Sequence, residues 1–228
     1  MTRGIGVTEF LREILPEWAT TVFVALSLPG DLIVIVPALG MLYAVDVTQR
    51  AHRKDAQRSP VCSDTTASIV AIILGGLALI VLLETVFALG RPPADWHAIE
   101  TSPYGFPSGH TMAATICWGA LAWVSSWGDR SVRLFLAGAI VAGVGISRLA
   151  LGVHYVVDVL ASFGLGVLYL GLAIPALYGR PVRGFAVAIL LGMFAFGVTL
   201  GETRGLLALS GTLGAALGWG LIEWIGRE

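Results

Sequence analysis

The feature that most constrains this chain is a series of apolar runs that are long enough to cross a lipid bilayer. A helical span needs roughly 17–25 mostly apolar residues, because the hydrocarbon core is about 30 Å thick and a helix rises about 1.5 Å per residue. Six runs meet this requirement, each bounded by charged residues or by Pro and Gly: 67–90, 110–127, 132–150, 155–178, 184–200 and 205–225. With 56% hydrophobic and 13% charged residues, the chain is expected to be an all-α, polytopic integral membrane helical bundle.

The N-terminal part is interpreted as one more span preceded by an interfacial helix. The sequence Pro29-Gly30-Asp31 interrupts the apolar stretch 19–47, and we take 31–47 as the span. Upstream, apolar and charged side chains occupy opposite faces of a helix, which is typical of a helix that lies in the membrane interface. The sequence therefore predicts six to seven transmembrane helices in a single domain, 1–228, with an interfacial N-terminal segment over 8–28.

The basic residues predict which loops face the cytoplasm. Lys and Arg accumulate on the cytoplasmic side of a membrane. Nine of them fall in alternate loops and the tail: Arg50, Arg53, Lys54, Arg58, Arg130, Arg133, Arg180, Arg183 and Arg227. Five fall on the other side: Arg3, Arg12, Arg91, Arg148 and Arg204. We therefore expect a multi-pass protein of the cell membrane in which the loops with Arg91, Pro107 and Arg148 face outward.

Charge and cysteine content exclude some classes of function. The formal net charge of −1 leaves no basic surface of the kind that nucleic acid requires, so no nucleic-acid partner is expected. Cys62 and Cys117 are far apart in the sequence, and Cys117 lies in an apolar run. They support neither a disulfide framework nor a thiolate metal site, and no metal or cofactor is expected.

A histidine and an aspartate four residues apart lie at the junction of two expected spans. On one helix, Asp158 would sit a turn beyond His154 and could accept a hydrogen bond from one ring nitrogen. The other nitrogen would then be free to attack, as in an activated nucleophile oriented by an acid. The alternative is a pair that only satisfies itself at a helix end. Ionisable residues at such depths usually mark function.

A second cluster, Pro107-Ser108-Gly109-His110, opens an apolar span. It would place a hydroxyl and backbone amides at a helix N-terminus, where partial positive charge favours a phosphate. His110 would lie beside that anion and could protonate a leaving oxygen as a general acid. The alternative is an ordinary Ser N-cap followed by a turn glycine.

Two arginines complete the set of charged residues on the outward side. Arg91 follows the span 67–90, and Arg148 lies near the end of the span 132–150. Guanidinium groups match phosphate oxygens and stay protonated, so both residues could hold a phosphate. The alternative for each is a side chain that snorkels to the interface.

Together these residues form a known pattern. The three stretches are Gly90-Arg91-Pro92, Pro107-Ser108-Gly109-His110 and Ser147-Arg148-x5-His154-x3-Asp158. They resemble the signature motifs of the type-2 phosphatidate phosphatase family, which is related to vanadium haloperoxidases, and the second and third match in full. The motif-bearing core covers 84–158, and the surrounding layout of several spans is similar to the family architecture.

The resemblance implies a metal-independent phosphatase that works through a phosphohistidine. It implies that His154 attacks phosphorus, that Asp158 orients His154, and that His110 protonates the leaving group and then activates water. It also implies that the phosphate oxygens are bound by Arg91, Ser108, Gly109 and Arg148.

The first motif departs from the family at one position. The family pattern is Lys-x6-Arg-Pro, and the residue seven positions before Arg91 is Glu84. A buried carboxylate near a phosphate repels it unless the carboxylate is protonated or paired. Three interpretations remain open: Glu84 pairs with Arg148 or Arg91 and fixes its orientation, Glu84 is neutral, or the site has a weaker phosphate affinity or a shifted substrate. Increased activity on replacing Glu84 with Lys would argue against a useful pairing.

The leading hypothesis for the substrate is a lipid phosphate or an isoprenoid (di)phosphate, because a site at the membrane surface suits such a molecule, with the lipid bilayer as the surrounding partner. A soluble sugar phosphate is the alternative substrate. Phosphatidate, phosphatidylglycerol phosphate and polyprenyl diphosphate all share the anionic head and apolar tail. Two other functions are weighed against hydrolysis. One is a phosphotransferase that moves the head group to an alcohol, and the other is a non-catalytic lipid-binding or transport protein, for which Glu84 would be an intramembrane charge.

Overall fold

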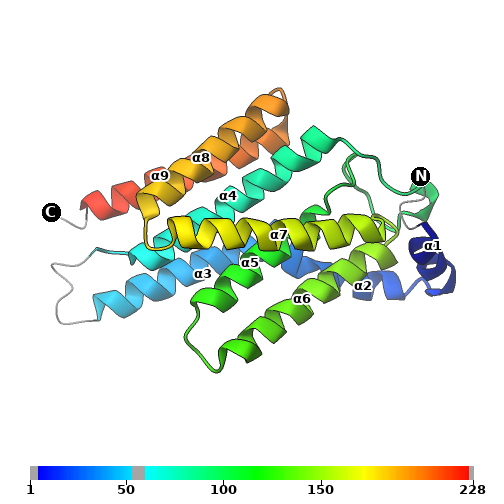
Figure 1. Ribbon diagram of the computed structural model, residues 1–228, viewed down its shortest axis with the longest axis horizontal. Helices are drawn as coiled ribbons and strands as arrows, with labels where there is room; N and C mark the ends of the chain where they lie inside the picture. The colour runs from blue at the N-terminus through cyan, green and yellow to red at the C-terminus, as the bar shows by residue number, and fades with distance from the viewer. Residues whose placement is uncertain (1–4, 53–59, 226–228) are drawn as a thin grey trace. The chain divides into compact units, whose positions relative to one another are not determined.

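A computed structural model describes residues 5–52 and 60–225 of the chain. The helices in chain order are α1 Ile5–Ile14, α2 Ala19–Ser27, the 3₁₀ turn η1 Leu28–Gly30, α3 Leu32–Ala51, α4 Asp64–Phe87, the 3₁₀ turn η3 Ala94–Trp96, α5 Gly109–Val124, α6 Arg130–Ala150, α7 Val156–Leu177, α8 Pro181–Val198 and α9 Thr203–Ile225 (Figure 1). Five basic residues of the orientation prediction lie outside the described residues: Arg3, Arg53, Lys54, Arg58 and Arg227.

The apolar runs of the sequence become helices of membrane-spanning length. Within the described residues, six helical stretches are long and apolar enough to cross a membrane: Ala19–Ala51, Asp64–Phe87, Arg130–Ala150, Val156–Leu177, Pro181–Val198 and Thr203–Ile225. Helix α5 has 16 residues, a rise of about 24 Å, and is shorter than these. The predicted all-α, polytopic membrane fold is confirmed.

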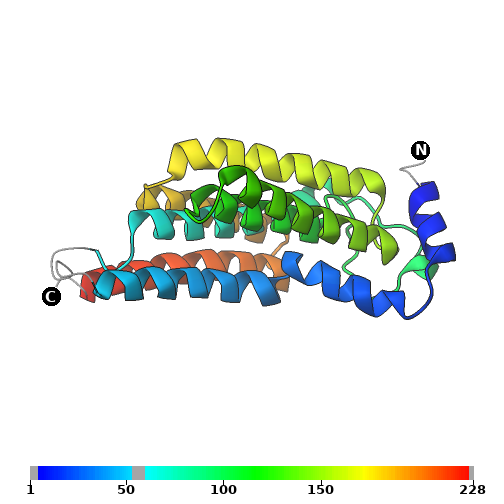
Figure 2. The same cartoon turned by 90° about the horizontal axis from the view of Figure 1, so that it is seen from below.

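The N-terminal segment contains two helices separated by a turn. Figure 2 shows that α1 lies across the direction of α2. The exposed side chains of α1 include the apolar Val7, Phe10 and Ile14, with exposed fractions of 49%, 58% and 55%. This pattern agrees with the amphipathic helix that the sequence predicts. Its location in the membrane interface stays a prediction, as does the single domain 1–228.

The chain divides into two compact units, and the first is formed by Met1–Val34 and Leu83–Leu170. In this unit α5 and α6 form a helical hairpin, and a cluster of Ala114, Val141 and Val144 packs between them (Figure 1). Small residues allow close packing of α7, because a Cβ at Gly145 would lie 2.7 Å from Val159 and one at Gly166 would lie 2.8 Å from Thr115. All residues that the sequence assigns to a site belong to this unit.

The second unit is formed by Ile35–Leu82 and Gly171–Glu228. Helices α8 and α9 are antiparallel neighbours joined by a short turn (Figure 1). Phe185 of α8 stacks on Trp219 of α9 with a ring-centroid distance of 5.3 Å. The main-chain N–H of Cys62 donates to Glu223 at 2.9 Å, so this carboxylate ties the start of α4 to α9. Glu223 is buried in the unit.

Candidate active site

The three motifs converge in the first unit, at the ends of four helices. Arg91 follows α4, Ser108 to His110 begin α5, Arg148 lies in the last turn of α6, and His154 and Asp158 lie at the start of α7. Glycine permits the turn that joins α6 to α7, because Gly152 has φ +73° and a Cβ there would collide with the Trp96 carbonyl. The helix ends thereby deliver chemically different side chains to one place.

His154 is fully enclosed, with 1% of its surface exposed. Its Nδ1 lies 2.8 Å from the carbonyl oxygen of Gly105, which can only accept a hydrogen bond. Its Nε2 lies 2.9 Å from an amino nitrogen of Arg91, which can only donate. The neutral ring is therefore protonated at Nδ1, and Nε2 carries the lone pair. Burial lowers the pKa of His154 to about 4, with Asp158 opposing this change and Arg91 and Arg148 adding to it.

The carboxylate of Asp158 lies farther from the His154 ring than the hydrogen bond that the i, i+4 spacing predicts. Its Oδ2 lies 3.7 Å from Nδ1 of His154 and accepts a 2.9 Å hydrogen bond from the main-chain N–H of Tyr155. Asp158 therefore closes the first turn of α7 and supplies negative charge near the imidazole. The Gly105 carbonyl, at 2.8 Å, is the nearer partner of Nδ1. The orienting role of Asp158 stays a prediction.

Arg91 is held by main-chain and side-chain acceptors on both sides. It donates from Nε to the Ser102 carbonyl at 2.6 Å, from a terminal nitrogen to Ser102 Oγ at 3.0 Å and from the other to the Val153 carbonyl at 2.9 Å. Gly105 packs on this side chain, since a Cβ there would lie 2.9 Å from Arg91 Cγ. Burial lowers the pKa of Arg91 to about 10, so the guanidinium stays charged at neutral pH.

Arg148 is a second buried guanidinium, with 3% of its surface exposed. Among the described residues its Nε is a buried donor without a hydrogen-bond partner. An unsatisfied buried donor is costly, and an anion at this position would satisfy it. This feature disfavours the alternative in which Arg148 snorkels to the interface.

Ser108 occupies the N-cap position of α5 without capping the helix in the part of the chain that the structure describes. Its hydroxyl lies 3.0 Å from Thr111 Oγ1, and its main-chain N–H donates to the Asp158 carbonyl at 3.5 Å. The second motif is thereby joined to the third. Gly109 is the first residue of α5, so its amide lies at the positive end of the helix dipole.

His110 meets a residue that the sequence motifs do not include. Its Nε2 lies 3.4 Å from Oδ2 of Asp31, and the two side chains are 31% and 42% exposed. Asp31 also accepts a 3.0 Å hydrogen bond from the Ile33 N–H and thereby caps the N-terminus of α3. The contact with His110 gives no signal in the sequence, because the two residues are far apart along the chain.

Two further contacts of the site were missed for the same reason. The hydroxyl of Thr8, on α1, donates to the main-chain carbonyl of His154 at 3.0 Å and is fully buried. The carbonyl of Gly105 orients His154, and a backbone acceptor leaves no trace in side-chain patterns. The motifs therefore identify side chains that the fold brings together, and they omit part of the structure that holds these side chains.

Glu84 lies near the end of α4 and is buried, with 3% of its surface exposed. Arg91 donates to the main-chain carbonyls of Ser102 and Val153 and contacts the ring of His154, and these groups orient the guanidinium. The pairing of Glu84 with an arginine stays a prediction. Its burial makes it part of the interior and excludes a solvated surface position.

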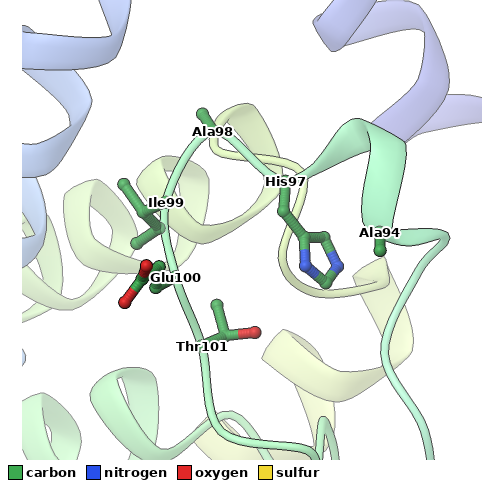
Figure 3. Close-up of a pocket in the computed structure, with 6 residues that line it drawn as sticks. All are labelled: Ala94, His97, Ala98, Ile99, Glu100 and Thr101. Atoms are coloured by element: carbon green, nitrogen blue, oxygen red, sulfur yellow. The ribbon is translucent and has the colours of Figure 1, made fainter.

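An open hollow of about 590 Å³ lies on the loop after Arg91, lined by Ala94, His97, Ala98, Ile99, Glu100 and Thr101. Figure 3 shows the imidazole of His97 and the hydroxyl of Thr101 inside the bend of the loop, with Ile99 and Glu100 on its outer side. His97 Nε2 lies 3.0 Å from the Pro92 carbonyl, which tethers the bend near Arg91. None of the residues assigned to the site from the sequence lines this hollow.

Comparisons with known proteins agree with the motifs and the fold. The chain is 32% identical over 110 residues to phosphatidylglycerophosphatase B of Bacillus subtilis (strain 168), a match covering 41% of this chain and 53% of that protein. The chain thus spans about half the length of this curated relative. The crystal structure of a transmembrane PAP2 type phosphatidylglycerolphosphate phosphatase from Bacillus subtilis matches with a TM-score of 0.63 and 23% identity, covering 77% of this chain and 84% of that one.

The family pattern described as the PAP2 superfamily matches residues 65–181, about half of the chain. This stretch contains Arg91, the run from Ser108 to His110, Arg148, His154 and Asp158. The predicted resemblance to type-2 phosphatidate phosphatases is therefore confirmed, and the chain belongs to the PAP2 superfamily.

Proposed function

We propose that the protein is a membrane phosphatase that hydrolyses a lipid phosphate or an isoprenoid (di)phosphate through a phosphohistidine on His154. The observation that carries this proposal is the pairing of His154 Nε2 with Arg91 at 2.9 Å in the same unit as the unsatisfied buried Nε of Arg148. A nucleophilic nitrogen among fixed cations suits a dianionic phosphate. Membership of the PAP2 superfamily and the phosphatidylglycerophosphatase relative support the same activity.

The first step transfers the phosphoryl group to His154. A phosphate oxygen that accepts from Arg91 would draw this N–H away from Nε2 and release its lone pair. Nε2 then attacks phosphorus, the bond from phosphorus to the ester oxygen breaks, and the leaving oxygen takes a proton from His110. The Nδ1 proton stays on the ring and faces the Gly105 carbonyl, with the Asp158 charge 3.7 Å away to stabilise the cationic ring.

The second step returns His154 to its starting state. His110, now neutral, takes a proton from water while the water oxygen attacks phosphorus. The bond between Nε2 and phosphorus breaks, its electron pair returns to Nε2, and phosphate leaves. Arg91, Arg148, Ser108 and the Gly109 amide would bind the phosphate oxygens in both steps.

The proposal places the site on the extracytoplasmic side of the cell membrane. Within the first unit, Arg130 and Arg133 lie at the start of α6 and Arg148 lies at its end. A rise of about 27 Å separates Arg130 from Arg148 along the helix, close to the thickness of the hydrocarbon core. By the positive-inside rule the end with Arg130 and Arg133 is cytoplasmic, which leaves the site on the opposite side.

Phosphate release by the detergent-purified protein tests the function. Phosphatidate and a long-chain isoprenyl diphosphate are supplied in excess chelator, and the wild type is compared with His154→Ala. Release from at least one substrate that survives the chelator and disappears in His154→Ala supports the proposal. Release that requires a metal, or that persists in His154→Ala, contradicts it, and the ratio of the two rates identifies the preferred substrate class.

A further inference from the structure

The carboxylate of Asp31 reaches the first turn of α5 and faces His110. The distance from Oδ2 to the Nε2 of His110 is 3.4 Å, within the range of an ion pair and at the long end of a hydrogen bond. Asp31 lies between η1 and α3, in a segment outside the matched family region 65–181. The contact therefore adds a group to the site that the three motifs do not contain.

The two oxygens of Asp31 have different partners. Oδ1 accepts the 3.0 Å hydrogen bond from the Ile33 N–H at the start of α3, and Oδ2 faces His110. The cap fixes the plane of the carboxylate, because the side chain cannot rotate without losing the bond to Ile33. One oxygen is used for local structure, which leaves the other one available to the imidazole.

The turn that carries Asp31 is docked on α5 by two further contacts. Trp118 Nε1 donates to the Pro29 carbonyl at 2.9 Å. Gly30 is buried against the main-chain carbonyl of His110, where a Cβ would collide with that oxygen. Only glycine allows this approach, so the turn lies directly beside His110, whose side chain contacts Asp31.

We propose that Asp31 is a positioning residue for His110 in the proposed phosphatase reaction. Asp31 accepts the Nε2–H of His110, which fixes the ring and leaves Nδ1 as the nitrogen that exchanges protons with the substrate. The inference rests on the proposed function, because it assigns a partner to the general acid and base of that reaction.

The proton balance follows from this arrangement. In the first step the imidazolium gives its Nδ1 proton to the leaving oxygen and keeps the Nε2–H that faces Asp31. In the second step Nδ1 takes a proton from the attacking water, and the imidazolium is restored. Asp31 stays ionised throughout, as the carboxylate does in a Ser-His-Asp triad.

Because Asp31 and His110 are partly exposed, a role of Asp31 in catalysis can be tested separately from a role in folding. With side chains 31% and 42% exposed, the contact between Asp31 and His110 is partly screened by solvent and contributes little to stability. Its effect is instead on the tautomer and orientation of the His110 ring. A change at Asp31 should therefore alter the rate of catalysis and leave the folded state nearly as stable.

The decisive variant is Asp31→Asn. Asn is as good an N-cap as Asp, so its side-chain oxygen keeps the bond to the Ile33 N–H. The other end of the amide is then an NH₂ group, a donor that faces Nε2 of His110. This geometry favours the wrong tautomer, with the proton on Nδ1. We expect kcat for phosphatidate to fall about tenfold to a hundredfold with little change in KM.

A second substrate tests the role through the leaving group. An alkyl-substituted nitrophenyl phosphate releases a stable phenolate that needs no proton, so the burst of phenolate that accompanies phosphorylation of His154 should be as fast in Asp31→Asn as in the wild type. Asp129→Asn is the matched control, because Asp129 is the N-cap of α6 in the same unit. Asp129 is exposed and lies at the start of α6, whereas Arg148 of the site lies at the end of this helix. We expect this control to be indistinguishable from the wild type on both substrates.

A double-mutant cycle completes the test. In a His110→Ala background, Asp31→Asn should cause no further loss, because its effect passes through His110. Equal turnover of phosphatidate by Asp31→Asn and wild type, or an undiminished loss in the His110→Ala background, would overturn the inference. Separately, ¹⁵N NMR of His110 should show the proton on Nε2 in the wild type and on Nδ1 in Asp31→Asn. The NMR measurement requires no turnover, so it tests the effect of Asp31 on the His110 tautomer independently of the proposed phosphatase activity.

Discussion

Two histidine–aspartate pairs lie in the same unit of the molecule, and they differ in burial. His154 and Asp158 have side chains 1% and 0% exposed and are 3.7 Å apart, whereas His110 and Asp31 are 31% and 42% exposed and 3.4 Å apart. The first pair lies at the N-terminus of α7, with His154 two residues before the helix begins, and the second joins α5 to the turn before α3. The same two residue types are therefore placed in two different environments.

The partners of the two rings differ as well. Both nitrogens of His154 contact protein groups, the Gly105 carbonyl and the Arg91 guanidinium, and its main-chain carbonyl accepts from Thr8. The ring of His110 contacts Asp31 through Nε2. A nucleophile benefits from a fixed orientation, whereas a general acid and base must reach both the leaving group and water. The difference in burial therefore agrees with the division of labour that we propose.

The largest expected effect separates the two histidines. His154→Ala should lower phosphate release at least about 1,000-fold, because the proposed covalent intermediate forms on His154. His110→Ala should still form the intermediate from an alkyl-substituted nitrophenyl phosphate and then hydrolyse it slowly, since its general base is lost. Rapid-mixing measurements should show a burst of about one equivalent of phenolate in His110→Ala and none in His154→Ala.

The burst experiment has its own control and its own contrary outcome. Phosphohistidine is labile in acid and stable in base, so the trapped protein from His110→Ala should lose its phosphate in acid only. A burst in His154→Ala, or a burst in neither variant from an active wild type, would mean that the two pairs do not divide the reaction as proposed.

The next largest effect is expected at Arg91, which contacts the buried ring of His154. Arg91→Lys keeps the charge but cannot satisfy Ser102, Val153 and His154 together, because an ammonium lacks the planar fork of a guanidinium. We expect kcat/KM to fall about a hundredfold in phosphate-release assays. Arg133→Lys is the matched comparison, since Arg133 also donates to main-chain carbonyls but lies at the start of α6. Equal losses in the two variants would indicate a general effect on folding.

The contrast between the pairs also shows what the sequence could predict. The apolar runs predict the spanning helices because lipid leaves a chain few other ways to satisfy its backbone. The His154–Asp158 pair is visible as an i, i+4 spacing on one helix. The His110–Asp31 pair is not, because only the docking of Gly30 on α5 brings the two residues together. The Gly105 carbonyl that faces His154 is a backbone group, and such groups carry no residue signature.

A smaller effect tests the contact between α1 and the buried pair. Thr8→Val keeps the side-chain shape but removes the donor to the His154 carbonyl, leaving a buried acceptor unsatisfied. The expected cost is about 1–2 kcal/mol of unfolding free energy, with a several-fold loss of kcat. Thermal unfolding in detergent and phosphate release measure the two effects, and Thr8→Ser, which keeps a hydroxyl, should restore both. If Ser and Val are equivalent, the hydroxyl of Thr8 has no part in holding His154.

The smallest expected effect is the pH dependence of stability that arises from burying the ring of His154. Burial lowers the pKa of His154 from 6.5 to about 4 in the folded protein. Between these values the unfolded chain binds a proton that the folded protein does not, so stability falls as pH falls from about 6.5 to about 4 and is unaffected by this residue above that range. The slope from one such group is at most about 1.4 kcal/mol per pH unit. Unfolding midpoints in detergent at several pH values should therefore decline across this window, and His154→Gln should reduce the decline. An unchanged slope in His154→Gln would show that His154 gains its proton without leaving its buried position, and burial of this ring would then make no pH-dependent contribution to stability.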